Sequence, residues 1–240
     1  MRKAVLVGLT LALLLAPGMV QAGMWISAEG GANFTASTSV NIAEENEKFT
    51  PVKREPAALG GLMIGYDFVK EGFLGYNYPD WMKYFSFVTD VTYNKAEVRK
   101  QLVTETEGGG AGWHEFFGPF EAELVCWSFM LKFRYGFFPD SEVPFGRLQP
   151  YLMVGPGILF SSARGANEEG WYQFHASSVD VALVTEAGLR WMCLKNVSMD
   201  AGFRFRWAEP KYTIPHEGTT TTMKTQYQLF TAMFRVSYHF

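Results

Sequence analysis

The sequence predicts an all-β protein, an eight-stranded antiparallel up-and-down transmembrane β-barrel formed by residues 23–240. Two observations lead to this fold class. Segments throughout the chain alternate apolar and polar side chains with a period of two, which is the period of a β-strand. Aromatic residues make up 16% of the chain and 24 residues are glycine, a composition that suits strands and tight turns.

Residues 1–22 have the three parts of a secretory signal peptide. Arg2 and Lys3 form a positive start, an apolar run follows to Ala16, and Val20-Gln21-Ala22 offers small residues for cleavage. The alternative, an uncleaved anchor, is disfavoured because the apolar run is shorter than the ~20 residues of a spanning helix. We therefore exclude this segment from the fold.

Eight segments carry the alternation. They are Trp25–Phe34, Ala58–Phe68, Tyr84–Asn94, Glu123–Phe137, Pro150–Ser161, Val179–Met192, Val197–Trp207 and Gln226–Phe240. The connections after the first, third, fifth and seventh are long and polar, and the others are shorter. This asymmetry predicts an up-and-down meander with its short turns at one end.

The alternation leaves open which face meets water. A soluble lipocalin-like barrel has its apolar face inside, whereas a membrane barrel has it outside. Large aromatic residues near both strand ends favour the membrane barrel, since they predict two interfacial girdles. The expected girdle residues are Trp25, Trp81, Tyr84, Tyr135, Tyr151, Trp191, Tyr238 and Phe240 at the short-turn end, and Phe34, Tyr93, Phe160, Trp207 and Tyr227 at the long-loop end.

The opposite face carries charges of both signs in nearly equal numbers. An eight-stranded barrel has room only for its own side chains, so charges inside it must be paired. The predicted interior network consists of Glu29, Asp67, Asp90, Lys132, Arg134, Glu186, Arg190, Asp200, Arg204, Arg206 and Arg235.

The last strand ends on an aromatic residue and has apolar residues at alternate positions before it. This resembles the C-terminal strand of bacterial outer-membrane proteins, and the whole segment pattern resembles the small barrels of the OmpA and OmpX type. The resemblance implies an outer-membrane location, contact with lipid and lipopolysaccharide, and recognition by the barrel-assembly machinery. The recognition signal would fall on Phe234, Val236, Tyr238 and Phe240.

Few residues suggest chemistry. Cys126 and Cys193 are expected at different heights, so we predict two free thiols. The sequence contains no motif that predicts a cofactor or a metal site. His175 and Ser177, with Glu209 on the neighbouring strand, form a weak match to the His-x-Ser pattern of lipid A deacylases, in which a base activates a serine.

The predicted function is non-enzymatic. A barrel that anchors four long surface loops suits an envelope, adhesion or ligand-contact role, and eight strands exclude a wide pore. The net charge of −3 and scattered basic residues give no reason to expect nucleic acid. The alternatives are an enzyme acting on outer-leaflet lipid and a soluble lipocalin-like carrier of an apolar ligand.

Overall fold

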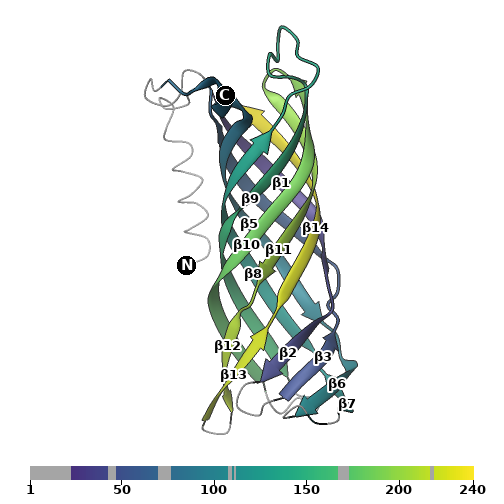
Figure 1. Ribbon diagram of the computed structural model, residues 1–240. Helices are drawn as coiled ribbons and strands as arrows, with labels where there is room; N and C mark the ends of the chain where they lie inside the picture. The colour runs from purple at the N-terminus through teal and green to yellow at the C-terminus, as the bar shows by residue number, and fades with distance from the viewer. Residues whose placement is uncertain are drawn as a thin grey trace.

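The computed structural model describes residues 23–42, 47–69, 77–107, 110, 112–166, 173–216 and 219–240. Eight strands close into an antiparallel barrel in the order β1-β14-β11-β10-β9-β8-β5-β4, and a second sheet has the order β12-β13-β2-β3-β6-β7. Figure 1 shows the tall barrel with the second sheet at its lower, long-loop end. The fold is the predicted all-β barrel.

The barrel strands are β1 (Met24–Thr35), β4 (Ala57–Asp67), β5 (Phe85–Val98), β8 (Phe120–Arg134), β9 (Leu148–Ala166), β10 (Gln173–Leu194), β11 (Val197–Ala208) and β14 (Tyr227–His239). All eight predicted strands are confirmed. Closure comes from pairing of the first strand with the last, from Trp25 opposite His239 to Thr35 opposite Leu229. Closure matters because it leaves no strand edge whose backbone groups lack partners.

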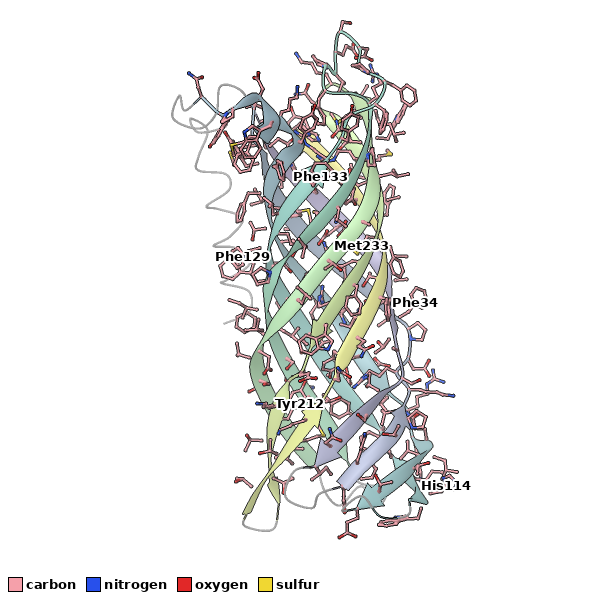
Figure 2. The ribbon with its side chains drawn as sticks, in the orientation of Figure 1. Phe34, His114, Phe129, Phe133, Tyr212 and Met233 are labelled. Atoms are coloured by element: carbon pink, nitrogen blue, oxygen red, sulfur yellow. The ribbon has the colours of Figure 1, made fainter. Side chains whose placement is uncertain are left out.

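The outer wall carries an apolar belt. Phe34 and Phe129 project away from the barrel (Figure 2). The remaining barrel strands also carry outward-facing residues. Exposed members include Phe87, Trp127, Leu152, Val181, Phe203 and Phe234. At the long-loop side the outward positions become polar, at Lys95, Glu123 and Ser177 for example. This arrangement contradicts the lipocalin-like alternative, which requires the aromatic face to fill the interior.

Three residues that were predicted for the interfacial girdles do not lie on the outer wall. Trp25, Tyr151 and Tyr227 are 0%, 5% and 0% exposed and lie inside the barrel. Alternation explains each placement, because Trp25 shares its face with Glu29, and Tyr227 shares its face with Arg235. At these positions the alternation of the strand, and not the preference of aromatic residues for interfaces, therefore decides which way the side chain points.

The long connections are largely strands and not the polar loops that the sequence suggested. The second sheet consists of β2 (Thr38–Ile42), β3 (Glu47–Val52), β6 (Gln101–Glu107), β7 (Trp113–Phe117), β12 (Lys211–His216) and β13 (Thr219–Thr225). A glycine-rich stretch lies between β6 and β7, and its residues 108, 109 and 111 lie outside the described residues. Between β4 and β5, a 3-10 helix spans Asp80–Tyr84.

The second sheet has an apolar inner face. Val52 and Val103 are buried, and Phe49 packs against Phe117 with ring centroids 5.2 Å apart. Tyr212 of β12 contacts the ring of Phe120 at the mouth of the barrel. The connections thus pack together as a cap at the long-loop end of the barrel, stabilised by the same hydrophobic effect as a soluble core.

The two cysteines are free, as predicted. Cys126 is buried in the barrel, where it pairs in register with Leu159. Cys193 lies near the end of β10, beside the tight turn that leads to β11. Their separation along the strands explains the absence of a bond between them.

Candidate functional site

The centre of the bore holds a five-residue ion cluster. Arg235 Nη2 lies 2.9 Å from Glu29 Oε2 and 3.0 Å from Glu186 Oε1. Arg204 Nε lies 2.8 Å from Glu186 Oε2, and its Nη2 lies 2.7 Å from Asp90 Oδ2. These five residues come from five different strands of the barrel. The cluster therefore ties the wall together across its interior.

A second group lies toward the short-turn end. Asp200 accepts from Arg190 Nε at 3.0 Å and from Arg235 Nη1 at 3.4 Å, and Lys132 Nζ lies 3.8 Å from the same carboxylate. Closer still to the short-turn end, Arg134 Nη1 lies 2.8 Å from Asp67 Oδ2.

Arg206 differs from the other interior bases. It donates to Asn94 Oδ1 at 3.2 Å and to Thr92 Oγ1 at 2.8 Å, and both acceptors are neutral. The side chain is 2% exposed, and Arg206 pairs in register with Leu229 of β14. The structure thus places all eleven sequence-predicted interior charges inside the barrel.

Several interior partners were not predicted. Trp25 Nε1 donates to Asp67 Oδ1 at 2.9 Å, Ser86 donates to the same oxygen at 2.7 Å, and Tyr151 donates to Glu186 Oε1 at 2.7 Å. The signal that could have found them is parity, since each lies an even number of residues from an interior position of its own strand. These donors satisfy carboxylate lone pairs that the arginines leave free.

The filled bore excludes a wide passage through this part of the barrel. The cluster residues Glu29, Glu186, Arg204 and Arg235 are between 0% and 6% exposed. Separating such pairs would leave buried charges without partners, which typically costs several kcal/mol for each broken pair.

The His-x-Ser match is not assembled into a catalytic arrangement. His175 Nε2 hydrogen-bonds Ser162 Oγ at 3.0 Å and not Ser177, while Glu209 accepts from Gln226 at 3.3 Å. Glu209 follows Ala208, which pairs with Ala182. The backbone of Glu209 therefore lies roughly 13 Å farther along the strand direction than Ser177. The structure thus gives His175 and Glu209 other hydrogen-bond partners than Ser177.

The hairpin of β6 and β7 presents apolar side chains outside the belt. Leu102 and Phe116 are cross-strand partners and are 56% and 53% exposed. The ammonium of Lys100 lies 4.8 Å from the Phe116 ring centroid, and Trp113 is 46% exposed. Figure 2 places His114 of this hairpin at the long-loop extremity of the molecule. Leu102 and Phe116 lie on the same face of the hairpin, and we call this pair the hairpin patch.

Arg54 fastens the second sheet to the barrel. It donates to Thr38 Oγ1 at 2.5 Å and to Thr225 Oγ1 at 2.6 Å, and its guanidinium lies 4.6 Å from the ring centroid of Tyr227. Burial lowers the pKa of Arg54 from its ordinary value. Arg54, between β3 and β4, thus connects the start of β2, the end of β13 and the start of β14.

Comparison with known proteins reveals similarity in structure alone. No protein-family model and no curated protein matches the sequence. The outer-membrane protein OprG from Pseudomonas aeruginosa aligns with a TM-score of 0.50 at 13% identity, over 92% of this chain and 98% of that one. The chain has the fold of a small outer-membrane β-barrel.

Two further solved structures align with lower TM-scores. Neisserial surface protein A gives a TM-score of 0.45 at 13% identity, over 91% of this chain and 98% of that one. The outer-membrane protease OmpT from Escherichia coli gives 0.44 at 8% identity, over 90% and 97%. The closed order of eight strands in this chain carries the assignment of the fold, and at such identities the function must be argued from the residues.

Proposed function

We propose that this barrel is a non-enzymatic outer-membrane anchor whose second sheet is a surface for contact with an extracellular ligand. The observation that carries the proposal is the hairpin patch. Large apolar side chains that are exposed to water beyond the belt do not stabilise the folded monomer. Clusters of such side chains are typical of interaction sites. The packed cap supports them on a rigid base, as recognition requires.

The location rests on three features. The apolar belt matches a bilayer, residues 1–22 would direct export and be cleaved, and residues 23–240 would form the inserted domain. Phe234, Val236, Tyr238 and Phe240 project outward from the last strand and would present the assembly signal to the barrel-assembly machinery. Outer-membrane lipid and lipopolysaccharide would then surround the belt and its polar margin at the long-loop side.

The hairpin patch can be tested by binding. Fluorescent liposomes carrying the purified protein would be applied to immobilised extracellular-matrix proteins. Replacing Leu102 and Phe116 by Ser should lower binding at least tenfold, because burial of each apolar side chain contributes roughly 1.5–3 kcal/mol.

The matched control replaces Thr104 and His114 by Ser. These two residues form the next cross-strand pair of the same hairpin, on the same face. The control should bind like the unmodified protein. Equal binding by the Leu102 and Phe116 variant would contradict a contact role for the hairpin patch.

The non-enzymatic assignment has its own test. The acyl-chain content of lipid A would be compared by mass spectrometry in cells with and without the protein. We expect identical profiles, since His175 and Ser177 lack the arrangement of a nucleophile and its base. Loss of an acyl chain only in cells with the protein would overturn the assignment.

A further inference from the structure

One carboxylate at the short-turn end of the bore serves three cations. Asp200 contacts Arg190, Arg235 and Lys132. Arg235 is already shared with Glu29 and Glu186. Asp200 is consequently the one carboxylate in ion-pair contact with Lys132 and Arg190 among the described residues. This part of the bore has more positive than negative charge.

Three donor atoms of these cations are unsatisfied. Arg190 Nη1, Arg190 Nη2 and Lys132 Nζ are buried and have no hydrogen-bond acceptor in the described part of the chain. Both side chains are 0% exposed. A buried guanidinium or ammonium with free donors is unfavourable unless an acceptor completes it.

The two cations also share an aromatic neighbour. The Trp25 ring centroid lies 4.4 Å from Arg190 Cζ and 5.3 Å from Lys132 Nζ. The Tyr151 ring centroid lies 4.0 Å from Lys132 Nζ. Aromatic faces attract cations but provide no hydrogen-bond acceptor of ordinary strength. The rings therefore hold Lys132 and Arg190 close to Asp200 and leave the excess positive charge in place.

The whole interior network also has more positive than negative charges. Its bases are Lys132, Arg134, Arg190, Arg204, Arg206 and Arg235, and its carboxylates are Glu29, Asp67, Asp90, Glu186 and Asp200. One positive charge is left over when all are ionised. Arg206 has two neutral acceptors and only Nε without a partner, so the larger set of free donors is at Lys132 and Arg190.

We propose that the bore binds one small monovalent anion of the halide class beside Lys132 and Arg190. The anion accepts from the free donors and removes the charge excess. Full burial restricts the ligand to an ion that sheds its water readily. The neighbouring Asp200 carboxylate disfavours multivalent anions by repulsion. The site is independent of the contact surface at the long-loop end.

The test is halide-dependent stability of the intact barrel. Unfolding midpoints would be measured in detergent while sodium gluconate is replaced by sodium bromide at constant ionic strength. We expect the midpoint to rise by roughly 5 °C over a hundredfold range of bromide, because a ligand that binds only the folded state stabilises it. Bromine NMR line broadening on the same samples would report binding directly.

Two variants separate this site from general salt effects. Lys132→Met balances the interior charges, so it should fold without bromide and lose the response. Lys95→Met alters an exposed residue paired with Glu121 outside the belt and should keep the full response. If Lys132→Met fails to fold, the NMR measurement on the unmodified protein decides alone.

Two results would overturn the proposal. One is an unmodified protein with neither a shift of the midpoint nor line broadening, in which case an uncharged Lys132 would balance the network. The other is an equal response in the unmodified protein and Lys132→Met, which would place the anion elsewhere.

Discussion

Gly65 and Gly60 lie on the same strand and face opposite sides of the wall. A Cβ at Gly65 would lie 2.1 Å from Trp25 Cζ2, whereas a Cβ at Gly60 would meet nothing within 4 Å. Gly65→Ala should therefore displace the indole from Asp67 and lower the free energy of unfolding by roughly 1–3 kcal/mol. Urea unfolding in lipid vesicles measures this, with Gly60→Ala as the near-neutral control. Equal losses would mean that the Trp25 contact is unimportant.

Glu186 joins two arginines and Tyr151 at the centre of the bore. Glu186→Gln leaves Arg204 and Arg235 with too little negative charge in a buried site. We expect a loss of roughly 3 kcal/mol in unfolding free energy, measured by the same urea titration. Glu121→Gln removes an exposed partner of Lys95 and should change stability little. A Glu186 variant as stable as the control would show that the cluster relaxes freely.

At the scale of the element, the second sheet should unfold separately from the barrel. Val103 is buried on the inner face of the second sheet, and its neighbour Thr104 faces outward. Val103→Asp should expose the long connections to protease while the barrel stays resistant, because a charge replaces a core side chain. Thr104→Asp should leave the cleavage pattern unchanged. Global unfolding of the Val103 variant would instead indicate one cooperative unit.

The last strand carries a separate prediction about assembly. Phe240→Ala should reduce the amount of folded protein in the outer membrane of cells but leave refolding into vesicles unchanged. The reason is that a side chain 49% exposed on the wall contributes little to packing. Phe203→Ala, 53% exposed on β11, is the matched control and should assemble normally. Parallel losses in cells and vesicles would point to stability and not to recognition.

At the scale of the whole molecule, closure and filling have different consequences. A closed barrel should resist SDS until heated, so unheated and boiled samples should migrate differently in electrophoresis. The packed ion cluster should prevent wide-pore conductance in planar bilayers. A stable conductance of porin size, from a preparation that shows the mobility shift, would contradict the filled bore.

The local alternation along each strand was readable from the sequence because it depends on neighbouring residues alone. Parity assigned Arg235 and Asp200 to one face and Phe234 and Phe203 to the other. Eight such segments, with alternating long and short connections, then predicted an up-and-down barrel. Parity would also have assigned Trp25 and Tyr151 correctly. These errors, and the one at Tyr227, arose because aromatic type was given more weight than position in the strand.

Contacts between distant strands were decided only by the tertiary structure. Strand closure brings Arg204, Arg235, Glu29 and Glu186 together across the bore, and no local pattern encodes which acid meets which base. The pairing of β2, β3, β6, β7, β12 and β13 likewise joins connections far apart in the chain. Short segments of mixed polarity have little strand signal alone, and they become strands because the barrel holds their ends in register.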